Sequence, residues 1–368
     1  MKPFKRVVLH IGGEKTGSTR LQQTLQEQRD YLLQVGIYTP LTGNMLGNCW
    51  GFAALAQHDP KRSFFLQMNP DASDHIAGCD DLMSQYQLEF GGVGSDYETL
   101  LISSEHLQTV VNIRGITRLF DWLETLTDRV QIVYVVRRQD QIMRSLLTTI
   151  LRGNASPAVL LNENVAQRLE SPRLNHWLAI SRYLMVSTNL KVSADVVSYS
   201  SGERLAQMDA RLRSLIGLPN DLTLPTTRSN PALRERTTRF MSTLLHPALG
   251  NYHELKQAQR REVASVLAES DSSQPFLPPK RWAESIIEPF KPSNNRSREM
   301  FLPTESSLFL EGGLKIYPDI ENYSLGMNRE EFMGVIDENP ELASLLPALR
   351  TPPPSDVFDQ IIRQYRLS

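Results

Sequence analysis

Residues 7–19 read VVLHIGGEKTGST, and this stretch decides the fold class of the chain. The apolar run 7–11 is rich in β-branched residues and predicts a buried strand. Residues 12–18 hold glycines and hydroxyls and predict a loop, and the apolar periodicity of residues 19–35 predicts a helix that ends at Gly36. A strand, a loop and a helix in this order open a βαβ unit.

The loop has the composition of an anion-binding turn. Backbone N–H groups in such a turn point at the anion, and the helix N-terminus adds partial positive charge. Lys15 would supply a full charge, and Ser18 and Thr19 would supply hydroxyl donors. Gly12 and Gly17 have the spacing of the ATP- and GTP-binding loop G-x-x-x-x-G-K-[ST]. Lys15, however, precedes the second glycine by two residues, which argues against an ordinary nucleotide kinase or ATPase.

A second motif follows at the end of another predicted strand. Residues 134–138 read YVVRR and close the strand predicted at 130–136, and Ser145 lies eight residues after Arg137, on a helix predicted at 140–151. An arginine fork matches phosphate oxygens bidentately, and a nearby hydroxyl donates a further bond. Arg138 is the alternative, one position along, but the spacing to Ser145 favours Arg137.

Residues 15–19, KTGST, resemble the 5′-phosphosulfate loop of sulfotransferases that use 3′-phosphoadenosine 5′-phosphosulfate (PAPS). The wider stretch 10–22 resembles bacterial members of this family, which act on glycans or other small acceptors. The resemblance implies that Lys15 contacts the phosphosulfate group and stabilises charge on the leaving oxygen. It implies that Arg137 and Ser145 hold the 3′-phosphate, which ATP lacks. The donor-binding residues are then Gly12, Lys15, Thr16, Gly17, Ser18, Thr19, Arg137 and Ser145.

The family's third nucleotide element is a basic loop near the C-terminus. The stretch 291–298 is the match here, and Arg296 is its expected phosphate contact, although the match is loose. A solvated basic loop without a ligand is the alternative interpretation of this stretch.

The transfer also needs a group that takes the acceptor's proton. Residues 103–106 read SSEH and follow a strand predicted at 99–103. Glu105 is the first choice, because some glycan sulfotransferases place a glutamate there, and His106 is the second, because cytosolic enzymes for small molecules use a histidine. The alternative is that either residue only begins a helix after the strand. His10 is expected to orient the loop.

The chain-wide pattern predicts an α/β fold. Strands predicted at 7–11, 99–103, 130–136 and 192–199 alternate with helices, which favours a P-loop-like three-layer fold with a central, mostly parallel sheet. Residues 41–98 are predicted to form an insertion with short helices near the acceptor site. The region from Pro219 onward is predicted to be mainly helix and loop. The expected division is a sulfotransferase domain at 1–303 and an extension at 304–368, packed on the same domain.

Composition narrows the function classes. The chain has 368 residues and a net charge of −2, so no overall field attracts nucleic acid or an anionic membrane. No apolar run approaches the roughly 20 residues of a membrane helix, and no signal peptide is recognisable, so a cytoplasmic protein is expected. Cys49 and Cys79 are expected to be reduced, buried thiols. No metal-ligand pattern is visible, so no metal is predicted.

These observations together predict a sulfotransferase. PAPS is the expected co-substrate, and the acceptor is expected to be the hydroxyl or amine of a carbohydrate or other small metabolite. Two alternatives stay open. One is a kinase-like nucleotide enzyme with a P-loop, and the other is a catalytically silent protein that binds a nucleotide or glycan on the same fold.

Overall fold

The computed structural model describes residues 2–57, 64–68, 74–93, 97–153, 157, 160, 164–200, 204–225, 233–250, 252, 255–309, 314–347 and 353–367. The chain divides into two units by its internal contacts. Unit 1 comprises Met1–Arg137, Arg168–Thr226 and Phe290–Glu311, and unit 2 comprises Arg138–Gln167, Thr227–Pro289 and Gly312–Ser368. These bounds do not coincide with the predicted division at residue 303.

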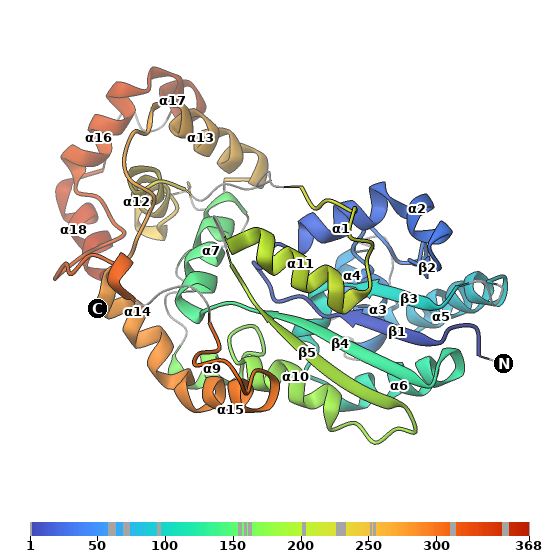
Figure 1. Cartoon of the computed structure of the whole chain (residues 1–368). Coiled ribbons are helices and arrows are strands. Elements are labelled where there is room, and N and C mark those ends of the chain that lie inside the picture. The colour runs from blue at the N-terminus through green and yellow to red at the C-terminus, as the bar shows by residue number, and fades with distance from the viewer. Residues whose placement is uncertain are drawn as a thin grey trace. The chain divides into compact units, whose positions relative to one another are not determined.

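Unit 1 is built on a parallel sheet of five strands in the order β2-β3-β1-β4-β5 (Figure 1). Every pair of neighbouring strands is parallel, so the predicted α/β fold with a central parallel sheet is confirmed. The strands are β1 (Arg6–His10), β2 (Ile37–Tyr38), β3 (Thr99–Ser103), β4 (Arg129–Val136) and β5 (Lys191–Ser198).

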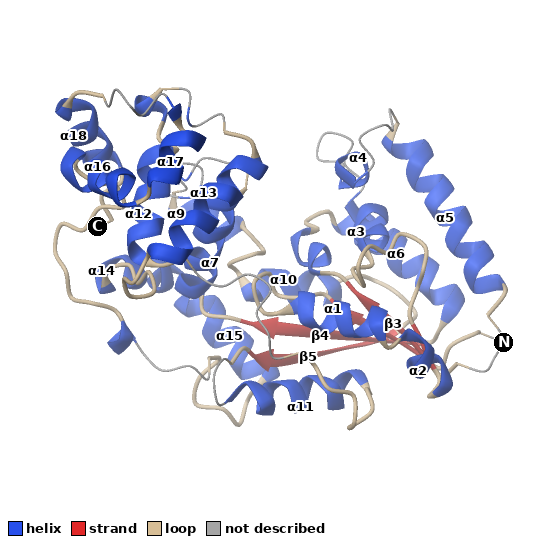
Figure 2. Cartoon of the chain, turned by 90° about the horizontal axis from the view of Figure 1, so that it is seen from above, coloured by secondary structure: helices blue, strands red, loops and turns tan. Residues whose placement is uncertain are grey.

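Helices cover both faces of this sheet (Figure 2). One face carries a core formed with α1 (Ser18–Glu27), α2 (Arg29–Gln34) and α11 (Leu205–Ile216). The other face carries the larger core, formed with α3 (Trp50–Gln57), α4 (Phe64–Met68), α5 (His75–Gly91), α6 (Ile113–Leu126), α10 (His176–Leu184) and α15 (Lys291–Phe301). Because both faces are packed, the middle of β1 is fully buried and reads as a continuous apolar run.

The described part of unit 2 consists of helices joined by loops. Its helices are α7 (Gln139–Arg152), α12 (Glu235–Leu244), α13 (Gln257–Ser270), α14 (Lys280–Ile287), α16 (Arg329–Glu338), α17 (Pro340–Leu345) and α18 (Ser355–Gln364), and α9 (Val165–Glu170) contains a unit boundary. The rings of Phe240 and Phe332 stack with centroids 4.5 Å apart, and Phe358 lies 5.4 Å from Phe332. These rings anchor α12, α16 and α18 to one another.

Most predicted elements are confirmed to within about a residue, three predictions are corrected, and one strand was missed. The helix expected over 19–35 is two helices, because the chain bends at Gln28 between α1 and α2. The strand β2 was not predicted. The insertion 41–98 holds α5, which is 17 residues long, and its residues 58–63, 69–73 and 94–96 lie outside the described residues. The basic stretch 291–298 is the start of α15, not a loop.

The two cysteines are free and buried, as predicted. Burial raises the pKa of Cys49 to about 12 and that of Cys79 to about 11, so both thiols stay protonated near neutral pH. Within the described residues, no helix is long and apolar enough to cross a membrane.

Candidate functional site

The loop between β1 and α1 has an unusual backbone. Gly12, Lys15 and Gly17 have positive φ values of 83°, 64° and 87°. A left-handed backbone costs a residue with a Cβ about 1–2 kcal/mol, so the conformation of Lys15 is imposed by its surroundings. Turns that mix left- and right-handed residues direct successive N–H groups into one concavity, and the first N–H groups of a helix have no partner within the helix. The φ values of the loop are of this kind, and anion binding by its N–H groups stays a prediction.

The hydroxyl residues of the loop divide between structural and exposed positions. Thr16 is buried, and both its N–H and its Oγ1 bond the carbonyl oxygen of Gly13, which closes the turn. Ser18 is buried in the first turn of α1, whereas Thr19 is exposed. Of the three predicted hydroxyl ligands, Thr16 thus has its own partner within the loop.

The loop lies directly against the ends of β3 and β4. The N–H of Val135 donates to the Gly12 carbonyl at 2.7 Å. A Cβ built on Gly13 would stand 2.1 Å from the Val135 carbonyl oxygen, and one built on Gly12 would stand 2.7 Å from the Cα of Glu105. Both glycines are therefore required by close backbone approach. The packing places the predicted base, Glu105, beside the loop.

Arg137 contacts the loop through its guanidinium group. Its Nη1 donates to the carbonyl oxygen of Lys15, and the guanidinium lies 4.4 Å from the centre of the Tyr199 ring. The structure thus brings together the two motifs that the sequence singled out. It also explains how the left-handed conformation of Lys15 is held, because the Arg137 guanidinium donates to the carbonyl oxygen of Lys15.

A series of four buried or partly buried hydrogen bonds joins the backbone of Glu14 to that of Arg137. The N–H of Glu14 donates to Gln108 Oε1 at 2.6 Å, and Gln108 Nε2 donates to the Tyr134 hydroxyl at 2.7 Å. That hydroxyl lies 2.9 Å from His176 Nδ1, and His176 Nε2 lies 2.8 Å from the Arg137 carbonyl oxygen. Because a carbonyl oxygen only accepts, Nε2 carries the proton and Nδ1 accepts from Tyr134. Each group in this series thus donates to the next, from the Glu14 N–H to the Arg137 carbonyl oxygen, and this order requires a neutral imidazole at His176.

The neutral imidazole of His176 and a second buried histidine, His10, predict a strong dependence of the protein's stability on pH. Burial lowers the pKa of His176 and of His10 from 6.5 to about 4, and the charge of Glu105 opposes the shift at His10. Below pH 6.5 the unfolded chain therefore binds protons that the folded chain does not. As the pH falls from about 6 to about 4.5, we expect each histidine to lower the free energy of unfolding by about 1.4 kcal/mol for each pH unit.

Urea unfolding of His176→Gln across this range measures the effect. The variant should lose about half of the slope that the two histidines cause. Tyr134→Phe is the matched control, because it removes a bond of the same series but leaves the imidazole. It should lower stability at every pH and keep the wild-type slope. A wild-type slope in His176→Gln would contradict the buried neutral imidazole.

The candidate bases lie at the start of a short 3₁₀ helix, Glu105–Thr109. Glu105 is half-buried, and its carboxylate accepts a hydrogen bond from the side-chain amide of Gln22 on α1. Burial lowers the pKa of His106, and the charges of Glu105 and Glu14 oppose that shift. A neutral His106 and a carboxylate at Glu105 are both able to accept a proton. The structure therefore brings both candidate bases to the loop and does not choose between them.

His10 and Glu14 complete the surroundings of the bases. The His10 ring is buried, with Nδ1 2.8 Å from the Ser103 hydroxyl, which fits the predicted orienting role better than proton transfer. Glu14 forms an ion pair with Arg173. Neither Gln22 nor Arg173 was predicted as a site residue, since Gln22 lies at the end of the resembled stretch 10–22 without an assigned role and Arg173 lies outside the motifs.

The other predicted phosphate ligands are placed as follows. Ser145 is half-buried on α7, in unit 2, and its pairing with Arg137 stays a prediction. Arg138 is buried in unit 2 and bonds Asp140 through Nε and Nη2, at 2.7 and 2.9 Å, so its guanidinium already has a carboxylate partner. Arg296 lies on α15 with its guanidinium 4.0 Å from the centre of the Trp177 ring. Its contact with phosphate stays a prediction.

No family model, curated protein or solved structure matches the chain. We therefore infer the function from the residues themselves. Within the described ranges no three His, Cys, Asp or Glu side chains gather as a metal ion would require, and the prediction of a metal-free site stays a prediction.

Proposed function

We propose that the chain is a sulfotransferase that transfers a sulfuryl group from PAPS to a hydroxyl or amine of a carbohydrate or other small metabolite. One observation carries the proposal. Lys15 stands in a left-handed turn between two positive-φ glycines, its carbonyl is bonded by Arg137, and Glu105 packs against Gly12. An anion-binding backbone, two cations and a carboxylate thus meet where the parallel strands end, which is the usual ligand edge of such sheets.

The reaction needs few protein groups. The acceptor oxygen or nitrogen attacks sulfur, a new bond forms to sulfur, and the bond between sulfur and the bridging phosphate oxygen breaks. The acceptor's proton passes to Glu105 or His106. Lys15 and the loop N–H groups stabilise the negative charge that appears on the phosphate product. The site offers donors where charge develops and a base where a proton is lost.

A 3′-phosphate has a receptor in Arg137. The guanidinium group has five N–H donors, and the Lys15 carbonyl engages Nη1. The guanidinium carbon lies over the Tyr199 ring, 4.4 Å from its centre, which limits the movement of the fork. A fixed arginine fork suits a phosphate monoester better than a ribose hydroxyl, so we infer that the nucleotide carries a 3′-phosphate.

Thermal unfolding with nucleotides tests this proposal. Adenosine 3′,5′-bisphosphate should stabilise the protein far more than AMP or ATP, because it alone carries a phosphate on the 3′-oxygen for Arg137 in addition to the 5′-phosphate for the loop. At a concentration of about 100 times its Kd, a ligand that binds only the folded state adds about 2.7 kcal/mol to the free energy of unfolding. Arg137→Lys keeps the charge but loses the fork, so it should reduce the preference for the bisphosphate. Arg211→Lys, at an exposed position on α11, is the matched control and should keep that preference.

The same measurement separates the alternatives. Equal shifts for all three nucleotides would remove the case for a 3′-phosphate receptor, and a larger shift with ATP would favour a kinase-like enzyme. A strong shift with the bisphosphate, joined to an absence of transfer from labelled PAPS to every acceptor in a broad panel, would favour a silent binding protein.

A further inference from the structure

The first halves of β4 and β5 differ from their second halves on the face that packs against α11. Strands of parallel sheets normally read as apolar on both faces because helices cover both. Here the early positions on this face are polar and at least partly exposed, and the later ones are buried valines. The early positions are Arg129 and Gln131 on β4, and Lys191, Ser193 and Asp195 on β5. The valines are Val133 and Val135 on β4, and Val197 on β5. Part of the sheet face is therefore open to solvent.

Three cations stand in one row across this open face. The register pairs Arg129 with Lys191, and it pairs Val7 with Val130, which places Arg6 beside Arg129. Neighbouring strands lie about 4.8 Å apart, and like charges in directly opposite positions destabilise a sheet. The row therefore lowers the free energy of unfolding when no anion is bound. Such a local conflict is typical of a functional position.

Arg6 is the fixed member of the row. Its guanidinium donates to Thr99 Oγ1, to Gln131 Oε1 and to the Ile216 carbonyl oxygen, each at 3.1 Å. Gly217 has a φ of 84°, and a Cβ built there would stand 2.3 Å from Arg6 Nη2. Three of the five N–H donors are thus engaged, and the side chain is held in one place with donors left for a ligand.

The nearby carboxylates have other partners. Asp128 bonds Lys2 Nζ at 2.8 Å, and that contact lowers the pKa of Asp128 more than the charges of Lys191 and Arg129 do. Asp195 accepts from Gln131 Nε2 at 2.8 Å. The positive charge of the three cations therefore exceeds the negative charge of the carboxylates beside them.

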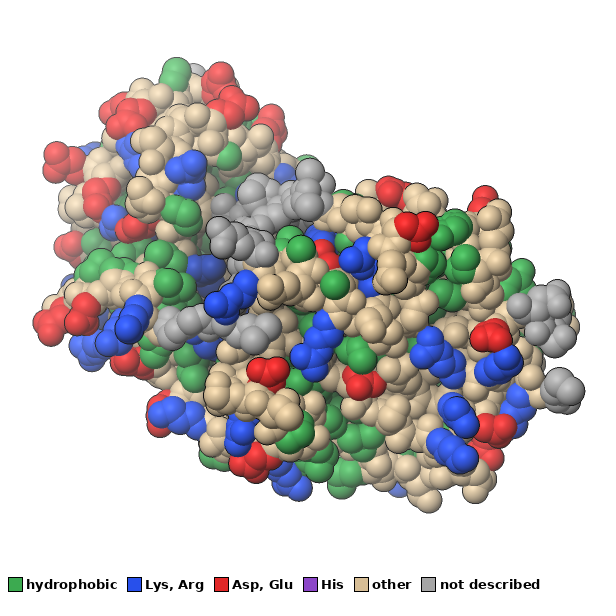
Figure 3. Space-filling model, in the orientation of Figure 1, with side chains coloured by type: hydrophobic (Ala, Val, Ile, Leu, Met, Phe, Trp, Pro, Cys, Tyr) green, Lys and Arg blue, Asp and Glu red, His purple; other side chains and the backbone are tan. Residues whose placement is uncertain are grey.

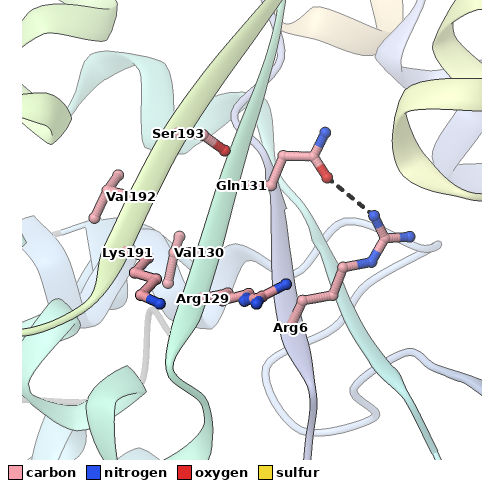
Figure 4. Close-up of a pocket in the computed structure, with 7 residues that line it drawn as sticks. All are labelled: Arg6, Arg129, Val130, Gln131, Lys191, Val192 and Ser193. Carbon is pink, nitrogen blue, oxygen red and sulfur yellow. Dashed lines mark hydrogen bonds between the residues drawn. The ribbon is translucent and has the colours of Figure 1, made fainter.

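The row borders a cavity of about 250 Å³ (Figure 4). It is lined by Arg6, Arg129, Val130, Gln131, Lys191, Val192 and Ser193. On the face shown in Figure 3, Lys and Arg side chains lie over the part of the molecule where these strands begin, with Asp and Glu side chains among them. We propose that this cavity binds an oxyanion group, a phosphate or sulfate ester on a small molecule such as a sugar. The cavity lies where the strands begin, at the opposite end from the Lys15 loop, so the proposal does not depend on the proposed function.

Calorimetric titration with glucose 6-phosphate, glucose 6-sulfate and glucose tests the proposal. The protein should bind one or both esters but not glucose, and the preferred ester identifies the source of the oxyanion. Arg129→Gln/Lys191→Gln should weaken this binding about tenfold or more, since each lost cation removes a charged hydrogen bond. Arg211→Gln is the matched control and should bind as the wild type does.

Two further measurements keep the result interpretable. Without ligand, the double variant should unfold at the same or a higher temperature than the wild type, because it lacks the repulsion within the row. Lys15→Ala separates the cavity from the loop and should retain ester binding. Unchanged ester binding in the double variant would overturn the proposal, and so would the loss of all ester binding in Lys15→Ala.

Discussion

Lys15→Ala should lower the rate of sulfuryl transfer by about a hundredfold or more, while the affinity for adenosine 3′,5′-bisphosphate changes much less. The reason is that charge on the leaving phosphate oxygen grows as the bond to sulfur breaks, so a cation at this point stabilises the transition state more than the ground state. Loss of one preorganised electrostatic contact typically costs on the order of a hundredfold to a thousandfold in rate.

The left-handed backbone at Lys15 makes Lys15→Gly a more informative variant than Lys15→Ala. Alanine would retain the left-handed strain at a φ of 64°, whereas Lys15→Gly removes the charge and relieves that strain. We expect Lys15→Gly to be as slow as Lys15→Ala but more stable to heat. Lys15→Arg, which keeps a cation, should retain more activity than either.

Single-turnover transfer from labelled PAPS, with an acceptor chosen from a screen, measures the chemical step, and calorimetry measures nucleotide affinity. Equal losses in rate and in affinity would mean that Lys15 stabilises the bound ground state as much as the transition state. Wild-type transfer by Lys15→Gly would show that the charge has no catalytic role.

The sequence predicted the central sheet because β1, β3 and the second halves of β4 and β5 are dense in apolar residues. The strand 99–103, a continuous apolar run, has the predicted bounds. The helix predicted at 140–151 spans Gln139–Arg152, since its apolar residues recur with the helical period and Gly153 follows it. The two-residue strand β2 is too short to show any period. The helix α15 buries only Asn294 and Ser297 along its length, so it has no apolar stripe by which it could be recognised.

The candidate site was predicted in part for a related reason. Lys15, Arg137 and Glu105 lie in local motifs at strand ends, and the sequence shows such motifs directly. The series of hydrogen bonds through Gln108, Tyr134 and His176 joins residues that are far apart in the sequence, and no single-sequence pattern reports such contacts. A hydroxyl inside the apolar run of β4, at Tyr134, was the available signal, because a buried hydroxyl requires a partner.

Glu105→Gln should slow transfer by about a hundredfold to ten-thousandfold and leave nucleotide affinity nearly unchanged. The glutamine has nearly the same shape, so the packing of this residue against Gly12 should persist, but an amide does not accept the acceptor's proton. The assay is the same single-turnover transfer, compared with His106→Ala.

Gln22→Ala supplies the matched control for position. It removes the side-chain amide that bonds the Glu105 carboxylate without removing the carboxylate itself. We expect a smaller loss of rate than in Glu105→Gln, because the base is still present but held less firmly. Gln22→Glu, which places a second carboxylate beside Glu105, should slow transfer more than Gln22→Ala does.

The comparison of the two bases decides the assignment. If Glu105→Gln is slow and His106→Ala is active, the carboxylate is the base and the half-buried imidazole is structural. A fully active Glu105→Gln beside an inactive His106→Ala would assign the proton to the histidine, whose lowered pKa keeps it neutral and able to accept near neutral pH. If both variants transfer sulfate at the wild-type rate, neither residue at the end of β3 is the base, and the proposed route of the proton is wrong.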